Sequence, residues 1–236
     1  MTSSSLTSHL LSQTNSPAYI AATNHSFLKK AGEGTLSPET LAHWLYQDRI
    51  YAAHAYPRFV GLLIAKIPFE THDLTAFRSD VTRAESANRQ ILECLSFSLT
   101  NTVREVKFFE TTAEGVDARS SREIESERPE TRNYTAEMAR VASLGTLKEG
   151  LVFLWAMEKM YLDSWTFASR QTKEERSKGL DAFIANWSSD EFKKFVDDLE
   201  KLVDLLGIEQ GSDDWKQAEA IWNRVIELEE AFWPNA

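Results

Sequence analysis

The segment from Leu147 to Ser169 most constrains how this chain can fold. Its large apolar residues lie on most of the circumference of a helix rather than along one stripe. A helix that is apolar on most sides must be buried on most sides, so other elements have to surround it. The sequence therefore predicts a fold built round this central helix, whose large apolar residues are Leu151, Phe153, Leu154, Trp155, Met157, Met160, Tyr161, Leu162 and Trp165.

The rest of the chain also has the periodicity of helices. No segment alternates apolar and polar residues with a period of two, and there are only nine glycines and six prolines. The expected fold class is all-α, a single domain of about seven or eight helices. Besides the central helix, helical segments are expected over residues 17–34, from Ser37-Pro38-Glu39 to about Lys66 with a kink at Pro57, and over residues 74–99, 103–109, 134–144, 189–207 and 213–233.

Two segments differ from this helical pattern. Residues 1–16 are rich in Ser and Thr and are expected to be flexible, although Leu6, Leu10 and Leu11 would also suit a short helix. Residues 111–132 contain almost no large apolar side chain and many charges of both signs. A long polar loop is expected there, either mobile or acting as a lid. The helical domain is expected to span residues 17–236.

The charge and the apolar content restrict the location and the partners. The formal net charge is −10, and no cluster of Lys or Arg lacks interleaved acids, which disfavours nucleic acid as a partner. No apolar run approaches the ~18 residues of a membrane span, and no signal sequence is recognisable. Cys94 is the single cysteine, so no internal disulfide can form. We expect a soluble, cytoplasmic protein with neither a membrane nor nucleic acid as its partner.

The helix that begins near Pro38 carries an unusual polar pair. Asp48 and Tyr51 are three residues apart and share one helix face, where Ala52 and Ala55 are small neighbours. A carboxylate and a phenol among small side chains leave room for a ligand. The alternative is a surface aspartate beside an amphipathic tyrosine, because acidic residues are mostly exposed.

Several kinds of site find no motif in this sequence. There is no Cys-x-x-Cys, no His-Glu-x-x-His, no glycine-rich phosphate loop and no nucleophile elbow. The inward Glu-x-x-His pairs of a di-iron bundle are also missing. His54 lies near Asp48, but a lone helical histidine is more often a surface or core residue than a ligand. No metal and no cofactor is expected.

Four short stretches occur together in a characteristic order: His25-Ser-Phe27, Gly32-Glu-Gly34-Thr-Leu36, Tyr46-Gln-Asp48-Arg-Ile-Tyr51 and Glu229-Glu-Ala-Phe232-Trp233. As a set they resemble the TenA (thiaminase II) family, over roughly residues 19–233. The resemblance implies a heme oxygenase-like helical fold without heme, assembled as a dimer or tetramer. It also implies a pyrimidine ligand and hydrolysis of aminopyrimidines from thiamin breakdown, with release of the amine and hydroxymethyl pyrimidine.

The resemblance implies roles for individual residues. Asp48 matches the family aspartate that holds the aminopyrimidine edge. Glu229 matches the glutamate that handles the proton of the leaving amine, so these two are the expected catalytic residues. Tyr51, Tyr134 and Tyr161 match pocket tyrosines and are expected to bind substrate.

Two pocket positions depart from the family pattern. Met157 stands four residues before Tyr161, where the family has its catalytic cysteine, and a thioether is a poor substitute for a thiolate nucleophile. Trp187 replaces a further pocket tyrosine, and both residues are still expected to line the substrate site. Cys94 lies on an apolar helix face and is expected to be an inert core residue. Glu158 either rims the cavity or pairs with a basic residue.

Three functions fit these observations. The first is a thiamin-salvage hydrolase that acts on aminopyrimidines with water in place of the thiol and has little action on thiamin itself. A branch of the TenA family without the cysteine is thought to rely on carboxylates, which agrees with this expectation. The second is a non-catalytic protein that binds a pyrimidine or another small aromatic ligand. The third is a different reaction in the same cavity.

Overall fold

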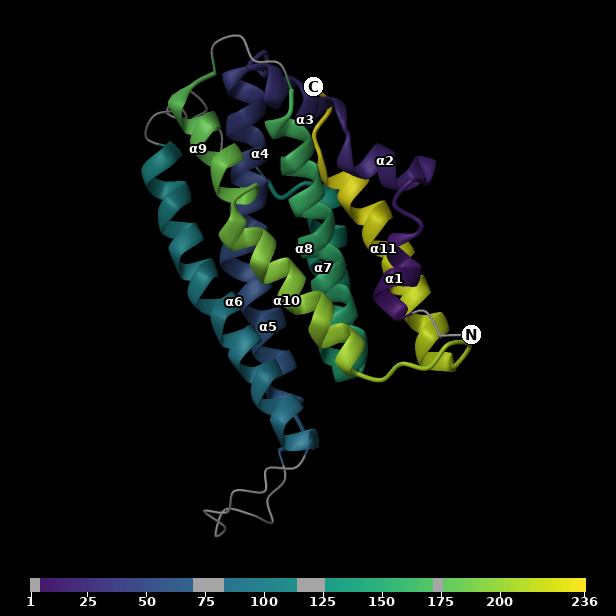
Figure 1. Cartoon of the computed structure of the whole chain (residues 1–236). Helices are drawn as coiled ribbons and strands as arrows, with labels where there is room; N and C mark the ends of the chain where they lie inside the picture. The colour runs from purple at the N-terminus through teal and green to yellow at the C-terminus, as the bar shows by residue number, and fades with distance from the viewer. Residues whose placement is uncertain (1–4, 70–82, 114–125, 172–175) are drawn as a thin grey trace.

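A computed structural model of the protein describes residues 5–69, 83–113, 126–171 and 176–236 (Figure 1). Within these ranges the chain forms eleven α-helices and one π-helix and contains no strand, so the expected all-α class is confirmed. The helices are α1 (Leu6–Leu11), α2 (Pro17–Thr23), α3 (Ser26–Glu33), α4 (Pro38–Ile50), the π-helix η1 (Tyr51–Ala55), α5 (Tyr56–Ala65), α6 (Arg83–Ala113), α7 (Pro129–Leu144), α8 (Leu147–Ser169), α9 (Lys178–Trp187), α10 (Asp190–Leu205) and α11 (Asp213–Phe232).

Helix α8 has the predicted bounds and the predicted central position. It packs against α10 and α9 on one side and against α11, α2 and α3 on another (Figure 1). Every residue from Leu151 to Met157 is buried, as the apolar circumference requires. Gly150 allows α5 to approach closely, because a Cβ at this position would lie 2.2 Å from Cδ2 of Leu63.

Serine side chains define where many of these helices begin. The hydroxyl of Ser37 accepts a hydrogen bond from the backbone N–H of Thr40, and Ser189 and Ser212 cap α10 and α11 in the same way. Thr146 and Glu149 form a reciprocal capping box at the start of α8. These caps explain why the starts expected at residues 37–39, 189 and 213 agree with the structure to within one residue.

The number of helices exceeds the expected seven or eight because two expected helices are divided and because α1 and α9 lie outside the expected helical segments. The expected helix over residues 17–34 is two helices, since His25 Nδ1 accepts from the backbone N–H of Phe27 and caps a new helix, α3. Conversely, α6 continues without a break through the expected gap between Leu99 and Val103.

The predicted kink at Pro57 takes the form of a π-helical turn. Proline cannot donate a backbone hydrogen bond, so the regular i to i−4 ladder cannot continue through it. The five residues before α5 instead form η1, where the N–H of Tyr56 bonds to the carbonyl of Tyr51. Such single π-turns occur often at functional sites, and this one begins at Tyr51, three residues after Asp48.

The amino-terminal residues form the short helix that Leu6, Leu10 and Leu11 allowed, from residue 5 onward. Leu6 and Leu10 of α1 are buried, and the Thr7 backbone N–H and hydroxyl both donate to the Asp204 carboxylate, at 3.2 and 2.9 Å. These contacts attach α1 to α10.

The expected bounds of the polar loop at residues 111–132 are wrong at both ends. Residues 111–113 belong to α6, and residues 129–132 belong to α7. Pro129 occupies the first turn of α7, where a missing N–H has no cost. The intervening residues 114–125, and residues 74–82 of the expected helix over 74–99, lie outside the described residues. Among the helices that are described, none combines the length and apolar character needed to cross a membrane.

Candidate active site

One buried cavity contains all seven residues that the sequence nominated. Asp48, Tyr51, Tyr134, Met157, Tyr161, Trp187 and Glu229 all line it. Its volume is about 50 Å³, several times the ~10–15 Å³ that one water needs. Asp48 and Glu229 both line this cavity, although 181 positions separate them along the chain.

Asp48 lies in the last turn of α4 and is 4% exposed. The hydroxyl of Tyr161, from α8, donates a long hydrogen bond of 3.4 Å to its Oδ2. Burial raises the pKa of Asp48 well above its ordinary value, the negative charge of Glu105 raises it further, and the Tyr161 hydrogen bond only partly opposes both. The alternative of a surface aspartate is therefore wrong.

Glu229 lies on α11 and is also 4% exposed. The hydroxyl of Tyr134, on α7, donates a hydrogen bond to its Oε1. Burial raises the pKa of Glu229 to about 7, against the opposing effect of this hydrogen bond. A carboxyl group with this pKa is present in both protonation states near neutral pH, which suits a group that both gives and accepts a proton.

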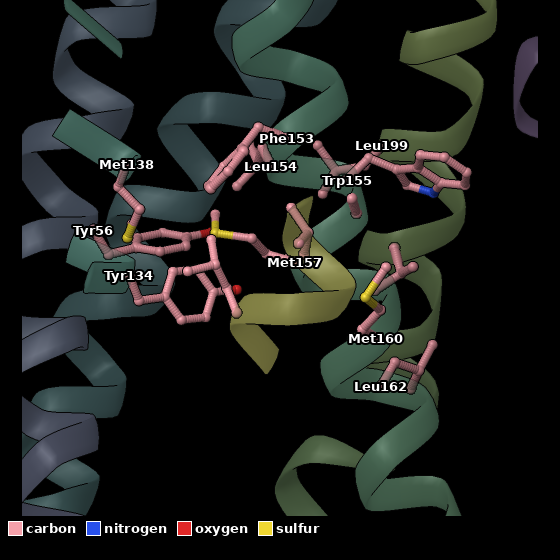
Figure 2. Close-up of a cluster of buried hydrophobic side chains, with 14 of the residues drawn as sticks. Tyr56, Tyr134, Met138, Phe153, Leu154, Trp155, Met157, Met160, Leu162 and Leu199 are labelled. Atoms are coloured by element: carbon pink, nitrogen blue, oxygen red, sulfur yellow. The ribbon is translucent and has the colours of Figure 1, made fainter. Parts of the chain in front are cut away.

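Met157 extends from α8 toward Tyr56 and Tyr134 (Figure 2), and its sulfur accepts a hydrogen bond of 3.3 Å from the hydroxyl of Tyr51. The position where a cysteine nucleophile is expected thus faces the cavity but carries a thioether. Cys94 lines a separate groove between α6 and α10. Burial raises the pKa of its thiol to about 12, so the thiol is poorly reactive.

Two further carboxyl groups line the cavity, and only one was considered from the sequence. Glu158, whose role was open, receives a hydrogen bond from the hydroxyl of Tyr56, and burial raises its pKa to about 8. Glu105 of α6 was missed. The indole N–H of Trp187 donates to it, and burial raises its pKa to about 7.

A sequence signal for Glu105 exists in α6. Ser98, Asn101, Thr102 and Glu105 follow the i, i+3, i+4, i+7 spacing of one helix face, and all four line the cavity. A polar stripe on a helix ordinarily faces solvent. The spacing alone therefore does not show that this helix face lines a cavity.

No lysine, arginine or histidine lines this cavity in the part of the chain that the structure describes. No group of three or more His, Cys, Asp or Glu side chains among the described residues is arranged to hold a metal ion. His54 lines a different groove, between α5 and α7. The cavity therefore combines acidic groups with aromatic walls, and a small nitrogen-bearing molecule is the type of ligand that would complement it.

Gln47, next to Asp48, fixes the start of α7. Its side chain is fully buried, donates to the carbonyl of Ser126 at 3.2 Å, and accepts from the Arg128 N–H at 3.0 Å and the Thr131 hydroxyl at 2.8 Å. Arg128, the residue before α7, makes no side-chain cap of its own. Gln47 thus takes the place of the missing cap and holds in position the helix that carries Tyr134.

A shallow depression at the surface adjoins the cavity. The two share Asn101, Trp187, Phe192 and Phe195, which come from α6, α9 and the first turns of α10.

The fold and the cavity define a class of protein: a single helical bundle that encloses buried carboxyl groups and aromatic rings around a small ligand site. The sequence profile described as TENA/THI-4/PQQC family matches residues 14–236. The chain therefore belongs to this family, and the resemblance to TenA is confirmed.

Solved structures agree with this assignment. The X-ray structure of a TenA homologue from Pyrococcus furiosus superposes with a TM-score of 0.78 at 25% identity, covering 97% of this chain and 98% of that one. Two others show the shared fold: a TenA family transcription regulator from Silicibacter sp. TM1040 (TM-score 0.74, 20% identity, 97% and 94% covered) and a putative TenA-like thiaminase from Sulfolobus solfataricus P2 (0.68, 14%, 95% and 92%).

A curated relative from Fusarium pseudograminearum (strain CS3096) is described as a probable transcription factor. The two sequences are 29% identical over an alignment of 266 positions, which covers 95% of this chain but 50% of the relative. The chain thus spans about half the length of that relative.

Proposed function

We propose that this protein hydrolyses an aminomethyl-substituted aminopyrimidine, releasing the amine and the hydroxymethyl pyrimidine without a cysteine nucleophile. The observation that carries the proposal is the convergence of Asp48 and Glu229 in one buried cavity. Buried carboxyl groups without a metal or a basic partner are costly, so packing alone gives no reason to place them together. Membership of the TenA family and the likeness to a TenA-like thiaminase support a thiamin-related substrate.

Each residue has a distinct task in this reaction. The Asp48 carboxyl group accepts a hydrogen bond from the exocyclic amine of the pyrimidine and, in its protonated form, donates one to the adjacent ring nitrogen, which orients the ring. Tyr51, Tyr134, Tyr161 and Trp187 provide the aromatic walls.

The chemical step uses Glu229 as the proton donor and water as the nucleophile. The bond between the methylene carbon and the amine nitrogen breaks, and a bond between that carbon and the water oxygen forms. Glu229 gives its proton to the leaving nitrogen and takes one back from the water, so no net proton is consumed. Because the activated thiol is replaced by water, turnover should be slow and thiamin itself should be cleaved little.

The decisive test is Glu229→Gln, with Glu230→Gln as the matched control. Glu230 is the next residue on α11 and is exposed. Release of amine from aminomethyl pyrimidine should fall by roughly 10²–10⁴-fold in Glu229→Gln and stay unchanged in Glu230→Gln. Equal rates in both variants and the parent would refute the role of Glu229.

A second candidate function is ligand binding without chemistry, and Met157 is the observation that favours it. A thioether in the nucleophile position is what a protein that retains the pocket and has lost turnover would contain. In that case Glu229→Gln would change only the affinity for hydroxymethyl pyrimidine, and no amine would appear. The name of the Fusarium relative points to regulation, but a chain with a net charge of −10 is poorly suited to binding nucleic acid.

A further inference from the structure

Helices α7 and α11 pack against each other, and one hydrogen bond in the cavity joins them. Tyr134 of α7 donates to Glu229 of α11. The acidity of Glu229 depends on this bond, because the Tyr134 hydroxyl opposes the effect of burial on the pKa of the carboxyl group. A residue that fixes α7 and α11 relative to each other therefore also controls the proton chemistry of Glu229.

The carboxyl end of α11 lacks the usual stabilising groups. The last four carbonyl groups of a helix have no partner within it, and the described residues that follow α11, residues 233–236, donate no backbone hydrogen bond to them. Pro234 has no N–H to donate. The last turn contains no basic residue and carries Glu229 and Glu230 at the negative end of the helix dipole. A positively charged donor from another element would stabilise this end.

Arg128 supplies such a donor. Its Nη1 donates a hydrogen bond of 3.3 Å to the carbonyl oxygen of Phe232, the last residue of α11. Its Nε forms an ion pair of 3.2 Å with Oε2 of Glu130, which orients the guanidinium group. The Arg128 side chain is only 21% exposed, so solvent competes little for these contacts.

The main chain of Arg128 is held as well. Its N–H donates to Oε1 of Gln47, the residue before Asp48 on α4. Arg128 also directly precedes Pro129, the first residue of α7. It therefore joins three helices that carry cavity residues: α4 through its backbone, α7 through the chain itself and α11 through its guanidinium group.

Phe232 connects the Arg128 contact to the cavity. Its ring lines the cavity and packs on the rings of Tyr51 and Tyr134, with centroid distances of 6.0 and 5.8 Å. A shift of the Phe232 backbone would move this aromatic wall and also Glu229, three residues earlier on the same helix. Arg128 does not itself line the cavity, so its guanidinium group acts through α11 and not on a ligand.

We propose that Arg128 is a positioning residue for Glu229. Its guanidinium group fixes the carboxyl end of α11 against the start of α7, so that the Tyr134 hydroxyl stays within reach of the Glu229 carboxyl group. The inference rests on the proposed function for the chemical role of Glu229. Arg128 acts on the chemical step and not on binding of the pyrimidine ring, which the proposed function assigns to Asp48 on α4.

The test removes the guanidinium group and keeps the main-chain bond to Gln47. Arg128→Met retains a long side chain without a donor, and Arg128→Lys restores a charged donor. Arg128→Gln, which is too short to reach α11, replaces Arg128→Met if that variant does not fold. The matched control is Arg224→Met, because Arg224 of α11 donates to Oδ1 of Asn133 on α7 at 3.0 Å and joins the same two helices at an exposed position.

Three measurements are made on each protein. The first is kcat and KM for release of amine from aminomethyl pyrimidine, and the second is the affinity for hydroxymethyl pyrimidine by calorimetry. The third is an NMR titration of the Glu229 carboxyl carbon in protein with ¹³C-labelled glutamate, where Glu229→Gln identifies the resonance. The titration needs no turnover, so it tests the positioning role independently of the hydrolase proposal.

Arg128→Met should lower kcat by about tenfold or more, because a small displacement of a catalytic group is costly. Its KM and its affinity for hydroxymethyl pyrimidine should equal those of the parent. The pKa of Glu229 should lie above the parent value, since the Tyr134 hydrogen bond that lowers it is weakened. Arg128→Lys should recover most of kcat and the parent pKa, and Arg224→Met should match the parent in every measurement.

An unchanged pKa of Glu229 in Arg128→Met, or equal shifts of this pKa in Arg128→Met and Arg224→Met, would overturn the inference. A weaker affinity for hydroxymethyl pyrimidine with an unchanged kcat would also contradict it. If the parent releases no amine, the hydrolase proposal falls, and the pKa of Glu229 still decides the role of Arg128. If the parent releases amine and this pKa does not move, the hydrolase proposal stands and the positioning role falls.

Discussion

The Glu229→Gln variant should gain stability relative to the parent protein as the pH rises. Burial raises the pKa of Glu229 from its ordinary 4.5 to about 7. In the unfolded chain this carboxyl group loses its proton near pH 4.5, whereas in the folded protein it keeps the proton until about pH 7. Between these values the folded state binds the extra proton, so the contribution of Glu229 to stability is complete below pH 4.5 and is lost by about pH 7.

The magnitude follows from the two pKa values. One pKa unit equals 1.36 kcal/mol, so ionised Glu229 costs the folded state about 3 kcal/mol relative to its protonated form. The side chain is only 4% exposed, so solvent screening reduces this little. Glutamine does not titrate, and its side-chain carbonyl can still accept the hydrogen bond from the Tyr134 hydroxyl. The free energy of unfolding of the variant, minus that of the parent, should therefore rise by about 3 kcal/mol between pH 4.5 and pH 8.

The assay is thermal or urea unfolding of both proteins at closely spaced pH values, with Glu230→Gln as the control. For a chain of this size 3 kcal/mol corresponds to a shift in Tm of about 6–12 °C. The control should track the parent at every pH. A difference that is constant with pH, or a variant that melts far below the parent at pH 8, would show that Glu229 is a structural carboxylate whose ionised form stabilises the fold.

Two further substitutions test neighbouring parts of the site. Met157→Cys should raise amine release by about tenfold or more by restoring a nucleophile; an unchanged rate with the fold preserved would argue that the cavity serves another substrate. Gln47→Leu leaves the Arg128 N–H and the Ser126 carbonyl without partners, so the free energy of unfolding should fall by about 3 kcal/mol. The value of kcat should also fall, because Tyr134 loses its fixed position. Thr131→Val, which removes one of the three contacts, should have a smaller effect on unfolding; an equal or larger effect would contradict the assigned role of Gln47.

The parts of this protein that the sequence predicted are those fixed by local chemistry. The bounds of α8 follow from a capping box and an apolar circumference, and the starts of α4, α10 and α11 follow from serine caps. The division between α2 and α3 escaped prediction because His25 acts there as a cap, a role seldom filled by histidine.

Only part of the candidate site could be predicted from local sequence patterns. Asp48 could be nominated from its spacing to Tyr51, but Glu229 could be connected to it only through a family resemblance. Their meeting depends on long-range packing, which spacing does not reveal. Glu105 was missed because an acidic residue on a helix is ordinarily solvated; only the packing of α6 over the cavity makes it a half-buried part of the cavity wall.

The central claim is that Asp48 and Glu229 act on opposite parts of one pyrimidine ligand. The most direct measurement is a crystal structure of the protein with hydroxymethyl pyrimidine, the product of the proposed reaction. The exocyclic amine and adjacent ring nitrogen should lie within hydrogen-bond distance of Asp48, and the hydroxymethyl oxygen should lie about 2.6–3.2 Å from Glu229. A ligand bound outside this cavity, or a ring turned so that the hydroxymethyl group faces away from Glu229, would contradict the account.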